Sequence, residues 1–310
     1  MIYTVTFNPA LDYVMWLPQL VPDRVNRTQR EKVFYGGKGI NVSIIMGHLG
    51  VENVALGFVA GFTGQEMEQG IKQQGVQTDF IHLDEGLTRI NVKIKGVDTR
   101  EETEVNAQGP SIPHEKLEEL FHQLERLTDH DTLILAGSIP NTLPSDVYEQ
   151  IMKRLEPKGV SVVVDATKEL LRNVLKYHPF LIKPNNHELG EMFDKVLDTQ
   201  EDIVFYAKEL QKEGARNVLV SMAGDGAILV TEQGEIHKMG VAKGQVINSV
   251  GAGDSMVAGF VAGYQEKKDY AYALKLGTAA GGATAFSEDL ASREKIEEVF
   301  AKLKQPKGKL

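Results

Sequence analysis

The sequence contains no cysteine in its 310 residues. This absence excludes disulfide bonds and thiolate metal sites, and it fits a reducing compartment. The sequence also has no uncharged apolar run that approaches the roughly 18 residues of a membrane span. Its N-terminus alternates like a β-strand and has no basic start typical of a signal peptide. We therefore expect a cytoplasmic protein that has no membrane partner.

Basic residues are too few to predict nucleic acid as a partner. Lys and Arg together number 34 against 43 Asp and Glu, which gives a formal net charge of −9. An anionic ligand must then be held by local cations rather than by the field of the whole protein. Apolar residues make up 42% of the chain, which is enough for the core of one large α/β domain.

Continuous apolar runs alternate with helical patterns along the second half of the chain. Residues 132–136, 160–164 and 180–182 are such runs, and amphipathic helices are predicted between them. Buried strands of this kind predict a parallel sheet that helices cover on both faces. Polar residues at the strand ends should line one rim of the sheet, where ligands bind. A surface helix is predicted over 294–303, and a frayed end over 306–310.

The most informative stretch is 248–255, Asn-Ser-Val-Gly-Ala-Gly-Asp-Ser. It follows a β-branched run at 245–247 and precedes a helix in which small residues recur every four positions, through Gly259 and Gly263. The glycines predict a tight strand-to-helix turn whose free amides and helix dipole bind an anion. Asp254 would repel that anion unless it takes a proton from a neighbouring alcohol. Capping of the helix by Asp254 is the alternative.

A second glycine-rich segment occupies residues 36–43. Its spacing matches neither a Walker A loop nor Gly-x-Gly-x-x-Gly. Three glycines let the backbone approach a polar ligand, to which Lys38 offers a charge and Asn41 an amide. Asp12 follows the first predicted strand and an Asn-Pro break, so it is either a ligand-facing carboxylate or a turn residue.

The two segments together resemble the PfkB (ribokinase-like) carbohydrate kinase family. That family pairs Gly-Gly-x-Gly-x-Asn, present here as Gly36 to Asn41, with Gly-Ala-Gly-Asp, present here as Gly251 to Asp254. The resemblance covers essentially the whole chain. It implies a three-layer α/β/α core with a mainly parallel sheet, in a single domain over 1–310. It also implies a small β-strand lid, inserted at about 12–35 and 88–108.

The resemblance further implies direct transfer of the γ-phosphoryl group of ATP to a sugar hydroxyl, with Mg²⁺ as the accompanying metal. Asp254 would accept the hydroxyl proton, while the amides of Gly251, Ala252 and Gly253 would hold the phosphoryl oxygens. Asn185 and Glu188 match the family's Asn-x-x-Glu pattern, which links Glu188 to the magnesium; a capped helix start is the alternative. The remaining nucleotide-binding positions are Lys183, Ser221, Gly224, Gly226 and Asn248.

Residues 89–95 form the clearest strand pattern in the sequence. Arg89 and the alternate residues after it are polar, whereas Ile90 and its alternates are apolar, and 103–106 can return the chain as a hairpin. In the family such strands form a lid over the sugar. The resemblance thus implies a substrate face that carries Arg89 and an apolar face that pairs two subunits into a homodimer. An ordinary solvated edge hairpin is the alternative.

Basic residues near the predicted sugar site exceed what a neutral sugar requires. Arg27, Lys38 and Arg89 fit a substrate that already carries a phosphate, although Arg27 could also be a solvated lid residue. Ser138 is a further candidate for that phosphate by resemblance. Asp12, Gly37 and Asn41 would hold the sugar itself.

Within the family, the sequence resembles enzymes that phosphorylate a phosphorylated ketohexose. The expected reaction converts fructose 1-phosphate to fructose 1,6-bisphosphate; tagatose 6-phosphate as the substrate stays open, since no residue decides between them. Alternatives from other classes are a non-catalytic sugar-phosphate-binding regulator, a nucleoside kinase and a dinucleotide-binding oxidoreductase. The intact Asp254, the surplus cations and the lack of an early Gly-x-Gly-x-x-Gly count against these three in turn.

Overall fold

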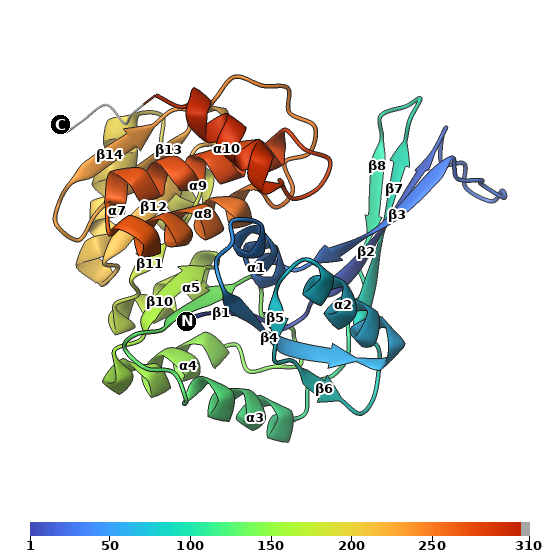
Figure 1. Cartoon of the computed structure of the whole chain (residues 1–310), viewed down its shortest axis with the longest axis horizontal. Helices are drawn as coiled ribbons and strands as arrows, with labels where there is room; N and C mark the ends of the chain where they lie inside the picture. The colour runs from blue at the N-terminus through green and yellow to red at the C-terminus, as the bar shows by residue number, and fades with distance from the viewer. Residues whose placement is uncertain (305–310) are drawn as a thin grey trace.

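A ten-stranded sheet runs through the centre of the molecule (Figure 1), as seen in a computed structural model that describes residues 1–304. Its strand order is β14-β13-β12-β11-β10-β9-β1-β4-β5, and β6 also pairs with β4. Neighbours are parallel except for β12–β13 and β13–β14. The strands are β1 (Ile2–Thr6), β4 (Asn53–Ala60), β5 (Gln77–Thr78), β6 (Ile81–Leu83), β9 (Thr132–Ala136), β10 (Ser161–Asp165), β11 (Leu181–Ile182), β12 (Asn217–Ser221), β13 (Ala227–Val230) and β14 (Ile236–Met239).

Helices cover both faces of this sheet, because the apolar side chains of its strands point alternately to each side. In β9, Leu133 and Leu135 pack with one helix layer, whereas Ile134 packs with the other. The first layer contains α3 (His114–Leu124), α4 (Val147–Leu155), α5 (Lys168–Val174), α6 (Asn186–Met192) and α7 (Gln200–Glu213). The second contains α1 (Lys38–His48), α2 (Gly61–Gln73), α8 (Ala252–Lys267), α9 (Tyr270–Ala285) and α10 (Arg293–Lys302). The predicted three-layer α/β/α fold is confirmed.

Helices α8 and α9 pack closely through their small residues. A Cβ atom at Gly259 would lie 2.7 Å from the carbonyl oxygen of Leu276, and one at Gly277 would lie 2.8 Å from that of Met256. Only glycine permits this approach without displacing backbone. The stripe of small residues predicted in this helix therefore fixes the position of α8, and with it the position of Asp254.

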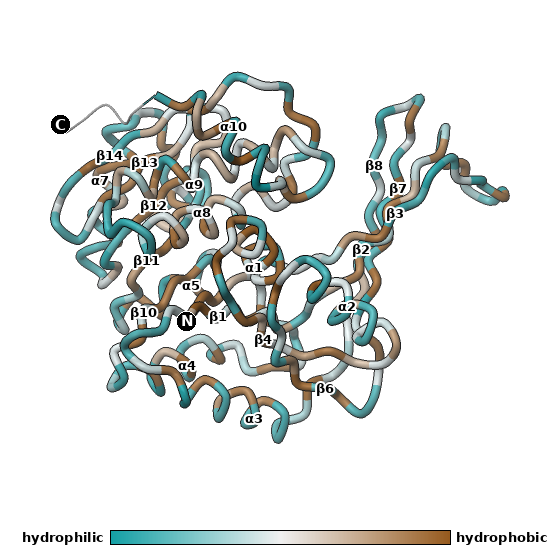
Figure 2. Tube along the Cα trace, viewed as in Figure 1, coloured by the Kyte–Doolittle hydropathy of each residue, from teal (hydrophilic) through white to brown (hydrophobic). Residues whose placement is uncertain are grey.

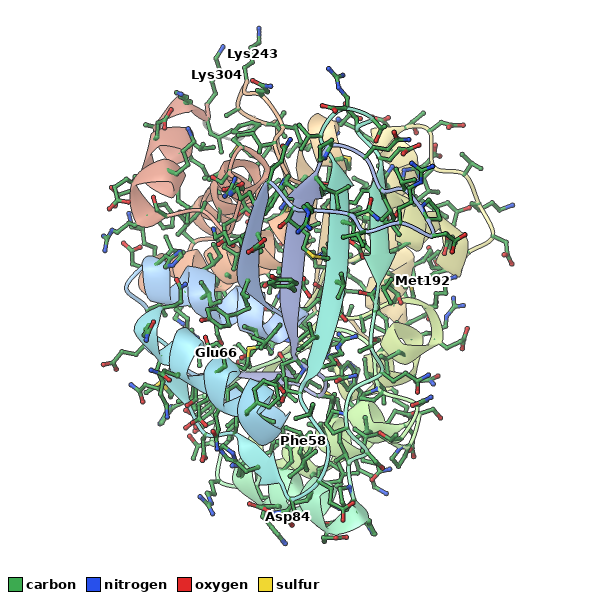
Figure 3. All side chains as sticks on the ribbon, turned by 90° about the vertical axis from the view of Figure 1, so that its right-hand side faces the viewer. Phe58, Glu66, Asp84, Met192, Lys243 and Lys304 are labelled. Atoms are coloured by element: carbon green, nitrogen blue, oxygen red, sulfur yellow. The ribbon has the colours of Figure 1, made fainter. Side chains whose placement is uncertain are left out.

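A second sheet, with strand order β3-β2-β7-β8, projects from one side of the core and faces the viewer in Figure 3. These strands carry both hydrophilic and hydrophobic residues (Figure 2), and the two kinds alternate along β7. On the face turned away from the core, Val33, Tyr13, Val92 and Val105 form one cross-strand row. We call this four-stranded sheet the lid. Its strands are β2 (Ala10–Leu17), β3 (Arg30–Gly36), β7 (Arg89–Gly96) and β8 (Glu102–Val105).

One local prediction is wrong. The apolar run at 245–247 is not a strand, because the chain from 240 to 250 pairs with no sheet. Val246 and Ile247 are 63% and 60% exposed, and the amide of Ile247 donates instead to the carbonyl oxygen of Ala285 at 2.8 Å. Strand propensity reflects a fit to a pleated, half-buried surface, and residues 245–247 have no neighbouring sheet edge within residues 1–304 with which to pair. The turn before α8 is therefore a loop-to-helix turn.

The surface helix predicted near the C-terminus is present as α10, whereas the predicted frayed end at 306–310 lies outside the described residues. Across residues 1–304, the structure contains no helix that is both long and apolar enough to span a membrane.

Candidate active site

A cavity of about 1500 Å³ lies between the lid, the carboxyl ends of the central strands and the start of α8. Most of the predicted site residues, which are far apart in sequence, line this one space. They are Asp12, Gly37, Lys38, Asn41, Arg89, Lys183, Asn185, Glu188, Ser221, Gly224, Asn248, Gly251, Ala252, Gly253 and Asp254.

Three predicted residues do not line the cavity. Arg27 is exposed on the loop between β2 and β3, and Ser138 is exposed on the segment after β9. Gly226 is buried beneath the residues that line the cavity. Its φ is +96°, and a Cβ atom there would collide with the carbonyl oxygen of Met239. The backbone of the turn therefore requires glycine at this position, whatever the turn binds.

The start of α8 has the geometry of an anion-binding site. Gly251, the N-cap residue, adopts the left-handed conformation (φ 78°, ψ −4°), which L side chains rarely adopt. The amides of the first turn that follows have no acceptor within the helix. A Cβ atom at Gly253 would lie 3.4 Å from Lys183 Nζ, so glycine leaves room between the helix start and a lysine. Both features favour a bound phosphate.

Asp254 lies in the first turn of this helix and is only 5% exposed. Asn41 Nδ2 donates to its Oδ2 at 2.7 Å, and Lys38 Nζ lies 3.9 Å from its Oδ1. No helix amide within residues 1–304 donates to this carboxylate, so the capping alternative is not supported. The carboxylate instead joins α8 to the glycine-rich segment at the start of α1.

A second buried carboxylate, that of Asp165 at the end of β10, shares the same lysine. Lys38 Nζ lies 3.1 Å from its Oδ2 and Lys183 Nζ lies 3.4 Å from its Oδ1. Asp165 is 1% exposed. The prediction from sequence missed it, although it is the polar residue that ends a buried parallel strand, where ligands usually bind.

The pKa values of the two carboxylates are shifted in opposite directions. Burial, followed by the negative charge of Asp165, raises the pKa of Asp254 to about 6, although Lys38 and Asn41 partly oppose the rise. Burial also acts to raise the pKa of Asp165, but the charges of Lys183 and Lys38 hold it below its ordinary value. Asp165 thus stays ionised while Asp254 is the group able to take up a proton. A pair of neighbouring carboxylates whose pKa values are shifted in opposite directions commonly includes the base of an active site.

The lid side of the cavity holds a second polar cluster around Asp12. The register of β2 and β7 aligns Asp12 with Asn91, whose Nδ2 donates to Asp12 Oδ1 at 2.8 Å. Lys93 Nζ lies 3.2 Å from Asp12 Oδ2 and 3.3 Å from Glu104. Asn91 and Lys93 were not predicted as site residues. The signal was available, because they alternate with Arg89 on one strand.

Arg89 brings an uncompensated positive charge to the same wall. Its Nε donates to the carbonyl oxygen of Asn8 at 3.1 Å, and its Nη1 to that of Ala107 at 3.5 Å. Across residues 1–304 no carboxylate lies within ion-pairing distance of it, and burial lowers its pKa. A half-buried guanidinium with neutral partners suits an anionic ligand that binds from the cavity.

The opposite end of the cavity combines a polar turn with apolar walls. Asn185 and Glu188 form the capping box of α6: Glu188 N donates to Asn185 Oδ1, and Asn185 N donates to Glu188 Oε2, both at 2.8 Å. The alternative stated for this pair, a capped helix start, is therefore confirmed. In residues 1–304 no donor reaches Glu188 Oε1, so that oxygen remains available in the cavity. The apolar walls, which sequence reasoning missed, include Ala242, Val246, Ile247, Ala285 and Phe286.

Comparisons with known proteins agree with this geometry. Residues 5–295 match the family described as "pfkB family carbohydrate kinase". The chain is 43% identical to 1-phosphofructokinase of Bacillus subtilis (strain 168) over 98% of this chain and 99% of that one. It is 37% identical to D-tagatose-1-phosphate kinase of Bacillus licheniformis, with 98% of each chain covered. A crystal structure of phosphofructokinase-2 from Escherichia coli in complex with substrates and products has a TM-score of 0.91 and 26% identity, over 97% of this chain and 98% of that one.

Proposed function

This chain belongs to the pfkB family of carbohydrate kinases, and we propose that it phosphorylates fructose 1-phosphate with ATP, giving fructose 1,6-bisphosphate and ADP. The observation that carries the proposal is the place of Asp254: a buried carboxylate with a raised pKa beside an anion-binding helix start, in a cavity shared with lid cations. It is a sugar-phosphate kinase, so a non-catalytic regulator is not favoured.

In the reaction, Asp254 takes the proton of the sugar hydroxyl. The hydroxyl oxygen forms a bond to the γ-phosphorus of ATP, and the bond from that phosphorus to the bridging oxygen of ADP breaks. The amides of Gly251, Ala252 and Gly253 hold the oxygens of the transferring group. A pKa of about 6 leaves Asp254 ionised at neutral pH and close to the working pH, as an efficient base requires.

The sugar phosphate lies against the lid. Arg89 and Lys38 supply charge for its phosphate group, while Asp12, Gly37 and Asn41 hold its hydroxyls. Ser138 stays a prediction for the same phosphate; it follows Gly137, where a Cβ atom would lie 3.7 Å from Lys38. Arg27 also stays a prediction, on the loop that joins two lid strands.

The nucleotide occupies the other end of the cavity. The apolar walls suit a flat purine base. Ser221, Gly224, Asn248 and Lys183 line the same cavity, and in this proposal they hold the ribose and phosphates, while Asn185 and Gly226 shape the turns beside them. Mg²⁺ prefers oxygen ligands and keeps several waters, so the free oxygen of Glu188 fits it. The metal would neutralise phosphate charge during transfer.

The preference for fructose 1-phosphate is drawn from the relative of higher identity. A tagatose phosphate, tagatose 6-phosphate above all, is the runner-up. A test is the release of ADP by the purified protein with fructose 1-phosphate, tagatose 1-phosphate, tagatose 6-phosphate or fructose 6-phosphate, each with and without Mg²⁺. We expect the highest kcat/KM with fructose 1-phosphate and loss of turnover without the metal. Preferred use of a tagatose phosphate would contradict the substrate, and binding without ADP release would contradict the activity.

We also propose that two copies of the chain pair through the outer face of the lid. Apolar side chains cross that face, and Val105 among them is 61% exposed. Val105→Lys should convert a dimer to a monomer in sedimentation equilibrium, because burying the new charge is costly. Val196→Lys is the matched control, since Val196 is 84% exposed and lies between α6 and α7, outside the lid. A wild type that sediments as a monomer would contradict the proposal.

A further inference from the structure

Asn91 carries an unusual unpaired atom. The residue is 7% exposed and lines the cavity. Its Nδ2 donates to Asp12 Oδ1, an atom that can only accept while Asp12 is ionised, and this bond fixes the orientation of the amide. Its Oδ1 is consequently left buried without any hydrogen-bond partner in residues 1–304.

Such an atom normally finds a partner, because an unsatisfied buried acceptor is costly. Four buried side-chain atoms in residues 1–304 lack one, namely Thr6 Oγ1, Asn53 Oδ1, Gln123 Oε1 and Asn91 Oδ1. Of these residues only Asn91 lines the cavity. Its free acceptor therefore points to a hydrogen-bond donor that the ligand supplies.

Lys93 adds the complementary donor. Its side chain is 13% exposed and lies between Asp12 Oδ2 and Glu104. Burial opposes its charge, but these two carboxylates raise its pKa, so the ammonium group stays charged. An ammonium group has three donors, and two of them face these carboxylates. A third donor is left for a ligand that lies beside the acceptor of Asn91.

We propose that Asn91 and Lys93 are specificity-determining residues which, with Asp12, hold one hydroxyl of the sugar phosphate and so select the configuration of the carbon that bears it. A hydroxyl both donates and accepts, which matches the free acceptor of Asn91 and the free donor of Lys93. Inverting that carbon moves the hydroxyl to the other side of the ring and leaves both buried groups unpaired. The inference rests on the proposed function, since it states how the same site recognises the configuration of its sugar.

The test compares the wild type with Asn91→Leu and Lys93→Met on the 1-phosphates of fructose and of its C3 and C4 epimers (psicose and tagatose), the two epimers in which a ring hydroxyl changes side. Both variants should lose roughly 10- to 100-fold in kcat/KM for fructose 1-phosphate, with KM for ATP unchanged. The discrimination between fructose 1-phosphate and one of the two epimers should shrink about tenfold, while the other ratio stays constant. An equal loss with all three sugars, or no loss, would overturn the inference.

Lys95→Met is the matched control. Lys95 follows Lys93 on the same face of β7 and pairs with Glu102 at 3.4 Å, but it makes no contact with Asp12, so the epimer ratios should stay as in the wild type. The single tryptophan of the chain, Trp16, lines the cavity, and its emission can report sugar binding without turnover. If the wild type phosphorylates none of the sugars, the proposed function fails, and Trp16 titrations still compare the epimers. If it phosphorylates them and the variants keep its ratios, the inference alone fails.

Discussion

Replacing Asp254 with asparagine is expected to lower kcat by roughly 10²–10⁴ and to leave KM for ATP nearly unchanged. The amide keeps the size of the carboxylate and can still accept the bond from Asn41. It cannot accept the hydroxyl proton, so only the step that needs a base is lost. The backbone amides at the start of α8, which hold the phosphoryl group, are not altered. Steady-state kinetics with saturating sugar phosphate measure both constants.

The matched control for this variant is Asp202→Asn. Asp202 is the third residue of α7, as Asp254 is of α8, but its Oδ2 accepts from Thr199 in a capping box. This control should cost some stability and no turnover. Near-normal turnover of the Asp254 variant would remove Asp254 from the role of base.

Loss of folding would not explain the loss of turnover, because Asp254 destabilises the folded state at neutral pH. Its folded pKa, about 6, lies above the ordinary value near 3.9. The folded protein therefore binds this proton more tightly than the unfolded chain. The stability from that difference is present below pH 4 and is lost as the pH rises through 6. The asparagine variant should thus melt at a temperature equal to or a few degrees above that of the wild type at pH 7.

The sequence predicted the sheet and its helix layers because central strands such as β9, β10 and β11 are continuous apolar runs, and such runs have few alternatives to burial between two layers. It predicted Asp254 because the glycines around it indicate a tight turn into a helix start, which can be recognised without the rest of the chain. Local signals of this kind are visible in a single segment.

The residues that sequence reasoning missed depend on pairing between distant segments. Asp165 ends a buried strand, as the sequence shows, but its pairing with Lys38 and Lys183 depends on how the fold brings distant segments together. Asn91 shares a strand face with Arg89 in the sequence pattern, but its contact with Asp12 depends on the β2–β7 register. The run at 245–247 shows the reverse case, since its strand-like residues find no sheet partner and form an exposed wall of the cavity instead. No local pattern encodes these long-range relations.

Lys38→Met is expected to change the pH dependence of the reaction as well as its rate. Lys38 Nζ lies 3.1 Å from Asp165 and 3.9 Å from Asp254, and its charge lowers the pKa of Asp254. Without that charge, burial and the repulsion of Asp165 act with less opposition, and the pKa of Asp254 should rise above 6. The base works only when ionised, so the acidic limb of the profile of kcat against pH should move to higher pH. At pH 7 we expect kcat to fall roughly 10- to 100-fold.

Raising the pH should restore part of the turnover of the Lys38 variant, because Asp254 then loses its proton again. The wild type, whose base is already ionised above pH 7, should show no such gain. Lys72→Met is the matched control: it removes an exposed lysine that pairs with Glu68 at 2.8 Å on α2, away from the cavity, and its profile should match that of the wild type. If Lys38 instead acts only by binding the phosphate of the sugar, KM should rise by the same factor at every pH and the acidic limb should stay in place. That result would separate the tuning of Asp254 from the binding of the substrate.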